Sequence, residues 1–179
     1  DKIDTGDILL QKRIKINKSD NAEDLHNSLS KIGSLLINDT INGVINNNIK
    51  STKQEPNKTY KTAYKLNKDN IKINWKSKPI EIYNKIRGLS PYPGARTTII
   101  DSKDNTKKNI IIYDCNYKLI NNKLNPGHII ISKNDFKISC IDGYIKLMDI
   151  KIEGKKRMKI KSFLNGFNSN NQLTARWKK

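Results

Sequence analysis

The pattern of apolar residues changes at Ala95 from a helical spacing to an alternating one, and this change most constrains the possible fold. Beyond it, turn residues separate five short apolar-rich stretches, which are residues 96–100, 109–117, 128–132, 136–141 and 144–152. Alternation of this kind predicts strands with one buried face. Asp142-Gly143 is a strong two-residue hairpin signal and Asn134-Asp135 a weaker one. Five short strands in about 60 residues predict a small five-stranded barrel of the OB type, which often contacts nucleic acid.

The first 50 residues contain a different pattern. Residues 4–7 are a turn sequence, and residues 8–16 form an apolar-rich run that predicts a strand. Asn21, followed by two acidic residues, is a helix N-cap, and apolar residues then recur at helical spacing as far as Ile45. One strand and one helix cannot build a core by themselves. We therefore expect residues 1–50 to be the end of a larger α/β domain whose sheet this chain does not supply.

The rest of the chain divides at a polar stretch. Residues 51–67 are rich in Lys, Asn and Thr and predict a linker. Residues 68–179 are expected to form the second domain and to fold alone, whereas residues 1–50 are not. This domain begins with a helix from Pro79 to Gly88, followed by the predicted barrel and a short helix that ends near Gly166. The expected fold class is therefore mixed α+β.

The chain carries a formal net charge of +18, which has two explanations. Such an excess is typical of proteins that bind a polyanion, most often nucleic acid. However, only five of the 35 basic residues are Arg, and the abundance of Lys, Asn and Ile is also what AT-rich codons produce. The positions where the charge clusters are therefore more informative than its total.

The cysteines and histidines indicate a reduced protein without a metal. Cys115 and Cys140 lie in predicted strands, where each is expected to be a small core residue in a reducing cytosol. The two histidines are far apart, and no CxxC occurs, so no metal site is expected. No apolar run approaches ~18 residues, and we expect a cytoplasmic, monomeric protein that does not span a membrane.

Several local motifs occur in one order along the chain. They are Ile3-Asp4-Thr5-Gly6-Asp7, Ile73-Asn74-Trp75, Ile86-Arg87-Gly88-Leu89-Ser90-Pro91-Tyr92-Pro93-Gly94-Ala95, Pro126-Gly127, Cys140-Ile141-Asp142-Gly143, Gly154-Lys155-Lys156-Arg157-Met158 and Phe163-Leu164-Asn165-Gly166. This series resembles the methionyl-tRNA formyltransferase family over essentially the whole chain. Three positions depart from the family pattern: Asn74 stands where the family has Asp, Gly88 where it has Ala, and Tyr92 where it has Trp.

The resemblance implies a fold and a reaction. It implies the last strand and helix of a Rossmann-like catalytic domain, followed by a tRNA-binding barrel. The implied reaction transfers a formyl group from 10-formyltetrahydrofolate to the amino group of initiator methionyl-tRNA. Asp4 matches the family's catalytic Asp, which works with an Asn and a His, and Ile3 and Asp4 would contribute to the folate site. From the residues alone, a turn cap before Gly6 is the favoured interpretation of Asp4, and the resemblance reverses that preference.

Part of that site is not in the chain. Neither the family's Asn-x-His pair nor its folate-lining Ser-Leu-Leu-Pro occurs in the 179 residues. We therefore expect the chain to be a fragment whose missing half is N-terminal. Two other functions remain open: a sugar-nucleotide formyltransferase, which would not require the basic motif, and a non-catalytic RNA-binding module.

Four basic residues are candidates for tRNA binding. Lys155, Lys156 and Arg157 lie between a strand and a short helix, a setting suited to phosphate, although a solvated basic loop has the same sequence. Arg87, at a helix C-terminus, is suited to RNA contact, to the helix dipole or to an acidic partner. Trp75 and Tyr92 are able to stack on bases, but we expect both in the local core.

Overall fold

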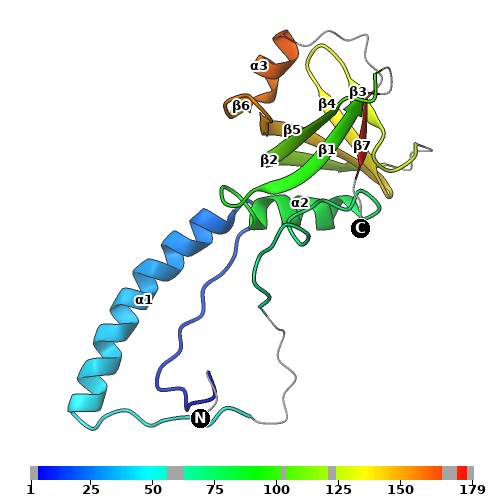
Figure 1. The fold of residues 1–179 in the computed structure, drawn as a ribbon. Helices are drawn as coiled ribbons and strands as arrows, with labels where there is room; N and C mark the ends of the chain where they lie inside the picture. Colours follow the sequence, from blue (N-terminus) through cyan, green and yellow to red (C-terminus); the bar gives the residue numbers. More distant parts are fainter. Residues whose placement is uncertain (1–3, 56–62, 102–103, 121–123, 167–172, 177–179) are drawn as a thin grey trace. The chain divides into compact units, whose positions relative to one another are not determined.

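The computed structural model describes residues 4–55, 63–101, 104–120, 124–166 and 173–176. It separates into two compact units, Asp1–Lys65 and Leu66–Lys179, and we describe each by itself (Figure 1). No helix in these ranges is long and apolar enough to cross a membrane.

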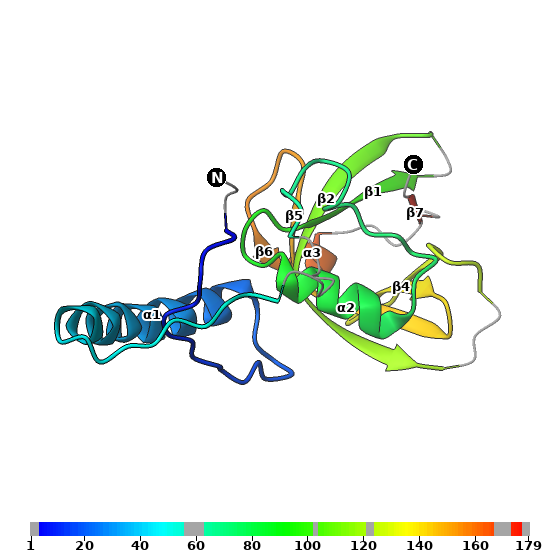
Figure 2. The ribbon, with the colours of Figure 1, turned by 90° about the horizontal axis from the view of Figure 1, so that it is seen from below.

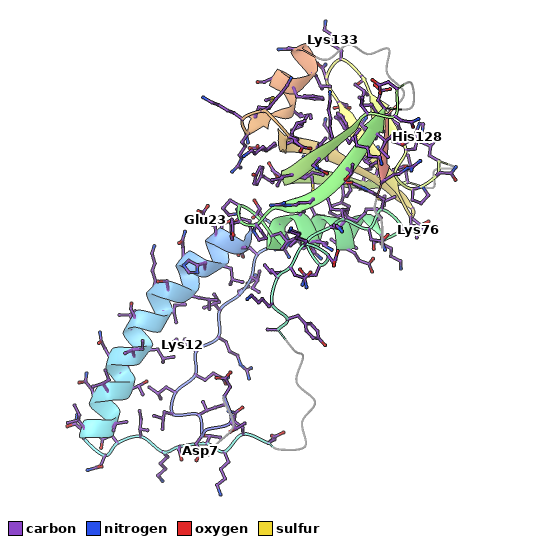
Figure 3. All side chains as sticks on the ribbon, in the orientation of Figure 1. Asp7, Lys12, Glu23, Lys76, His128 and Lys133 are labelled. Carbon is purple, nitrogen blue, oxygen red and sulfur yellow. The ribbon has the colours of Figure 1, made fainter. Side chains whose placement is uncertain are left out.

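The first unit is built on one long helix, α1 (Ala22–Ile45), which begins at the predicted cap. The Asn21 side chain accepts hydrogen bonds from the backbone N–H groups of Glu23 and Asp24, and the Asp24 carboxylate accepts one from the Asn21 N–H. No residue of α1 is buried, and Figure 3 shows its side chains projecting outward along the helix. The apolar stripe that the sequence predicts is therefore only partly covered. Leu25, Ile32 and Leu36 are half-buried, whereas Ile41 and Ile45 are exposed by 52% and 70%.

The strand predicted for residues 8–16 does not form. Only Ile8 pairs, through an isolated antiparallel bridge in which it exchanges two 2.8 Å backbone hydrogen bonds with Thr52. A run with strand propensity becomes a strand only when a neighbouring strand satisfies its backbone groups. Residues 9–16 have no such neighbour in the described part of this unit, so this apolar-rich run forms no strand there.

The second unit is a single antiparallel sheet that curls into a nearly closed barrel. Its strands are β1 (Ala95–Asp101), β2 (Lys107–Leu119), β3 (Ile129–Ile131), β4 (Phe136–Cys140), β5 (Gly143–Ile152), β6 (Met158–Lys159) and β7 (Leu173–Arg176). The order is β3-β4-β5-β2-β1-β7, and β6 pairs with β5. A bridge between His128 and Thr174 joins the two ends of this order.

The five predicted strands are confirmed, and two were missed. β6 has two residues, and β7 has only two apolar ones, Leu173 and Ala175, so neither is long enough to show a period. The Pro126-Gly127 motif lies where the sheet closes. The Gly127 N–H donates to the Ser139 carbonyl in β4, and the Gly127 carbonyl accepts from the Ala175 N–H in β7.

The hairpin between β4 and β5 has a different loop from the one that the sequence predicts. Cys140 pairs with Gly143, so the two loop residues are Ile141 and Asp142, and Asp142 takes the positive φ of 57°. Gly143 is required for another reason: a Cβ there would overlap the Lys118 carbonyl oxygen of β2 and would also crowd Pro79. The glycine therefore permits close packing of backbones rather than the turn itself.

Two helices lie against opposite ends of the sheet (Figures 1 and 2). α2 (Pro79–Gly88) begins at Pro79, as predicted, and packs on β2 and β5 through Ile82 and Ile86. α3 (Ile160–Asn165) ends before Gly166, as predicted, and packs on β5 and β6. The Phe163 ring of α3 lies 5.9 Å from the Phe136 ring of β4.

The core of the second unit is built from branched aliphatic residues around Trp75, which is fully buried. The Trp75 Nε1–H donates a 3.0 Å hydrogen bond to Thr97 Oγ1, which satisfies the one polar atom of the ring. The two cysteines are buried and unpaired, as the sequence predicts. Burial raises the pKa of the Cys140 thiol to about 12 and that of Cys115 further still, so both behave as small apolar residues.

Candidate nucleic-acid interface

The excess positive charge lies almost entirely in the second unit. Residues 1–65 contain 11 Lys and Arg against 8 Asp and Glu, whereas residues 66–179 contain 24 against 9. Basic residues are nearly as frequent in the first unit, so the contrast arises because acidic residues are scarce around the barrel. A drift toward Lys codons raises the basic content of both units and does not explain that scarcity. The distribution favours a polyanion-binding surface on the barrel unit.

The loop between β5 and β6 contains three of the predicted tRNA-binding residues. It turns at Gly154, where the Lys155 N–H donates a 2.9 Å hydrogen bond to the Ile152 carbonyl, and β6 then pairs back onto β5. Lys155 and Lys156 are both exposed at this turn. Their ammonium groups are therefore accessible to an external phosphate.

Arg157 is positioned differently from the two lysines. Its Nε and Nη2 donate hydrogen bonds of 3.0 and 3.2 Å to the two carboxylate oxygens of Asp149, and its guanidinium lies over the Tyr113 ring, 4.2 Å from the centroid. Lys159 Nζ lies 3.0 Å from the same carboxylate. Burial raises the pKa of Asp149, but the bonds from Arg157 and Lys159 lower it more, and the net result is below the usual value. Arg157 thus holds the base of the loop, whereas the sequence alone grouped it with the phosphate ligands.

Replacing Asp149 with Asn is expected to lower the free energy of unfolding at pH 7 by about 1–3 kcal/mol, because the Arg157 guanidinium loses a charged bidentate acceptor. The folded pKa of Asp149 is below its unfolded value, so the stabilisation is complete above the unfolded pKa and is lost as the pH falls through the folded pKa. Urea unfolding of both proteins between pH 7 and pH ~3 checks this. A difference that stays constant across that range would contradict the role of the carboxylate.

The Pro-Tyr-Pro-Gly turn lies against the same cluster. Gly94 has a φ of +77°, and a Cβ there would overlap Ile111 and touch the Tyr113 ring on which Arg157 stacks. Two residues earlier, Tyr92 is 88% exposed. The expectation that Tyr92 packs into the core is therefore wrong, while the same expectation for Trp75 is confirmed. The exposed Tyr92 ring is available for stacking.

Two residues of this cluster, Tyr113 and Asp149, were not predicted from the sequence. Both lie within strands, where an aromatic or acidic residue on an alternating face has no distinguishing local signal. Asp149 is only 5% exposed, and a buried acid inside an apolar strand does suggest a charged partner. The identity of that partner depends on the pairing of β5 with β6.

Arg87 lies on the last turn of α2 and interacts with its own helix. Its Nε donates a 2.9 Å hydrogen bond to Asn84 Oδ1, and its guanidinium lies 5.9 Å from the centre of the Tyr83 ring. The Tyr83 ring in turn lies 5.2 Å from that of Tyr117 in β2. This arrangement fits a residue that secures α2 on the sheet, and a contact between Arg87 and RNA stays a prediction.

The turn that contains Asp4 is held by residues 51–54. Asp4 has a positive φ of 62°, and Gln54 Nε2 donates hydrogen bonds to the carbonyls of Asp4 and Gly6, at 3.0 and 2.8 Å. The Ser51 hydroxyl donates a 2.9 Å hydrogen bond to the Asp7 carboxylate. The Asp4 residue itself is exposed, and its catalytic role stays a prediction. Ile3, the other predicted folate contact, lies outside the described residues.

A family model described as the formyl transferase C-terminal domain matches residues 65–168, which covers α2, the strands β1 to β6 and α3. The chain belongs to the formyl transferase family. Among relatives of this family, the methionyl-tRNA formyltransferase of Flavobacterium johnsoniae is 42% identical over 93% of this chain and 52% of its own length. The methionyl-tRNA formyltransferase of Clostridium novyi is 35% identical over 92% of this chain and 51% of its own length. The chain spans about half the length of the curated relatives it matches.

Several solved structures share this fold. The N-formyltransferase of Helicobacter canadensis was solved with folinic acid and dTDP-3-aminofucose and is 28% identical to this chain. The match spans 82% of this chain and 51% of the Helicobacter canadensis chain. Its TM-score is 0.55. HypX from Aquifex aeolicus is 15% identical to this chain, and the match spans 91% of this chain and 29% of HypX with a TM-score of 0.61. At this identity the likeness shows the fold alone. Among the residues that the structure describes, no group of His, Cys, Asp or Glu is placed to hold a metal ion.

Proposed function

We propose that this chain is the C-terminal part of a methionyl-tRNA formyltransferase, in which the barrel unit binds the initiator tRNA. The observation that carries the proposal is the 42% identity to a relative of that name over nearly the whole chain. The concentration of positive charge around the barrel supports it independently, because a tRNA substrate is a polyanion. The proposed protein is monomeric and works in the cytoplasm.

The proposed reaction moves one formyl group between two nitrogen atoms. The methionyl amine attacks the formyl carbon of 10-formyltetrahydrofolate and forms a tetrahedral oxyanion. Collapse of this intermediate breaks the bond to N10, and the proton that leaves the amine is returned to N10 of tetrahydrofolate. Donors that stabilise the oxyanion and groups that move the proton accelerate such a step. The solved Helicobacter canadensis relative, which holds folinic acid, supports a folate donor.

We assign the proton-handling role to Asp4, in partnership with a His and an Asn that lie outside these 179 residues. A carboxylate next to a His fixes the imidazole tautomer and raises its pKa, and it can pass a proton through water. The observed turn suits this role, because its backbone is held by Gln54 while the Asp4 residue remains exposed. Ile3 would contribute to the folate site next to it.

We assign tRNA contact to the exposed Lys155 and Lys156. Arg157 acts as a positioning residue, because its guanidinium is already bound to Asp149. Exposed Tyr92, on the turn that packs against Tyr113, would offer a ring to an unpaired base near the end of the acceptor stem.

Replacing both Lys155 and Lys156 with Glu is expected to weaken tRNA binding and to reduce its salt slope by about two, because each lysine contact with a phosphate releases one counterion. Binding is measured by titrating the chain with initiator tRNA at several salt concentrations. The matched control changes Lys76 and Lys133, two exposed lysines away from this loop, to Glu (Figure 3). Equal losses in the two double variants would show that only net charge matters and would refute the assignment.

A sugar-nucleotide formyltransferase is the second candidate, favoured by the 27–28% identity and TM-scores of 0.55–0.56 to two sugar N-formyltransferase structures. The two functions differ in their acceptor. The longest product that contains this chain should formylate methionyl-tRNA and leave a dTDP-amino sugar unmodified. The opposite result would establish the second candidate, and tRNA binding without activity on either acceptor would establish a non-catalytic RNA-binding module.

A further inference from the structure

A second basic surface lies on the barrel unit, apart from the loop that carries Lys155 and Lys156. It is a groove of about 630 Å³ over β1, β2, β5 and β7. Six cationic side chains line it, and these are Lys68, Lys72, Arg96, Lys107, Lys151 and Arg176. They are scattered over more than 100 residues of sequence, so only the folded sheet reveals the cluster.

The strand register explains how these cations meet. Arg96 of β1 pairs with Ile111 of β2, which pairs with Lys151 of β5, and on its other side Arg96 forms a parallel bridge with Lys72. Adjacent strands are ~4.8 Å apart, so Lys72, Arg96 and Lys151 form a row about 15 Å across. Arg176 pairs with Thr98, two residues beyond Arg96 on the same face, and begins a second row.

Little negative charge opposes these groups in the groove. Glu153 is the one acid that lines it in the described part of the chain, and its carboxylate accepts hydrogen bonds from the backbone and side-chain N–H groups of Asn109. Lys72 is paired with Asp69, whose side chain is 87% exposed, and an ion pair in that setting contributes little. Six cations confined to one groove repel one another until an anion enters, which favours a ligand with several charges.

The lining indicates which polyanion fits. The apolar residues that line the groove are Ile100, Ile110 and Ile111, and no aromatic ring is present among its described lining residues. Base stacking therefore has no platform there, while the arginines match phosphate oxygens. Glu153 lines this groove, and Glu153 and Lys155 both line a second, smaller pocket of the barrel unit, so one residue is shared by the groove and by the pocket that includes Lys155.

We propose that this groove binds the sugar–phosphate backbone of the RNA that the Lys155–Lys156 loop contacts, without reading its bases. The inference rests on the proposed function for the identity of the RNA. It adds a second, sequence-independent contact surface, formed by the outer faces of β1, β2, β5 and β7. The two arginines are its main phosphate ligands.

The test is the double variant Arg96→Ala with Arg176→Ala in the whole chain, with circular dichroism to confirm folding. Binding of initiator tRNA is titrated at several salt concentrations, and an elongator tRNA serves as the second ligand. We expect the salt slope to fall by about two for both RNAs and the affinity to fall by a similar factor for each. Changing both arginines to Lys should restore most of the slope, because the charge is kept.

The outcomes separate this inference from the proposed function. In one outcome the unchanged chain binds RNA, the Lys155–Lys156 variant binds it more weakly, and the arginine variant binds it as well as the unchanged chain. The groove is then not a binding site, and the proposed function stands. If the unchanged chain binds no RNA, both fail. If polyglutamate competes as well as RNA at the same salt concentration, the groove is a general site for polyanions and the assignment to a phosphate backbone is overturned.

Discussion

Replacing Trp75 with alanine is expected to lower the free energy of unfolding of the barrel unit by about 3–5 kcal/mol, the range seen when a large buried aromatic is removed. Trp75 is fully buried, and its indole N–H is bonded to Thr97 in β1. The substitution removes the ring from the core and leaves the buried Thr97 hydroxyl without its indole donor. Because a domain of this size is stabilised by only about 5–15 kcal/mol, the variant should lose much of its folded population.

The measurement is urea unfolding followed by far-ultraviolet circular dichroism, since the substitution removes a fluorescent residue. Tyr92→Ala is the matched control: it also deletes an aromatic ring from a motif of the second unit, but that ring is 88% exposed. The control should change the free energy of unfolding by less than about 0.5 kcal/mol. Similar losses in both variants would mean that the burial of Trp75 is not what stabilises the unit.

Replacing Asp4 with alanine should reduce the kcat/KM for formylation of methionyl-tRNA by a factor on the order of 10² to 10⁴, the usual contribution of a positioned acid or base. The assay uses the longest product whose sequence contains this chain. Because the Asp4 backbone carbonyl, rather than its side chain, accepts the hydrogen bond from Gln54, the turn should survive the substitution. The loss should appear in kcat with little change in the KM for tRNA.

Asp39→Ala is the control for this experiment, since Asp39 is also an exposed acid of the first unit but lies on α1. It should retain full activity. A loss of less than tenfold in Asp4→Ala would reduce Asp4 to a turn residue. An equal loss in both variants would indicate that the first unit tolerates no change of charge, which would also remove the catalytic assignment.

The local elements were predictable where they depend on short-range patterns. Asn21 caps α1 and Pro79 begins α2, because capping and the fixed φ of proline act within one turn of helix. The strands β1 to β5 of the barrel followed from alternation and from the turn residues between them. The strand over residues 8–16 was wrong because an apolar-rich run indicates a preference for extended backbone, while a strand also needs a neighbour.

The candidate site was predictable only in part. The order of motifs pointed to the family and to Lys155, Lys156 and Arg157, but the sequence treated these three as equivalent. Their surroundings differ, because Asp149 in β5 accepts two hydrogen bonds from the guanidinium of Arg157, whereas Lys155 and Lys156 are exposed at the turn. That contact depends on the pairing of β5 with the two-residue strand β6, which no periodicity marks.

The sequence by itself determined the type of each longer element in the barrel unit, its order and the family, since these follow from periodicity, caps and contiguous motifs. Only the tertiary structure decided that Trp75 is buried while Tyr92 is exposed, that Gly143 serves close packing rather than the turn, and that Arg96 and Arg176 line one groove. The physical reason is that burial and charge clustering depend on the register between strands. Residues far apart in the chain become neighbours only when that register is set.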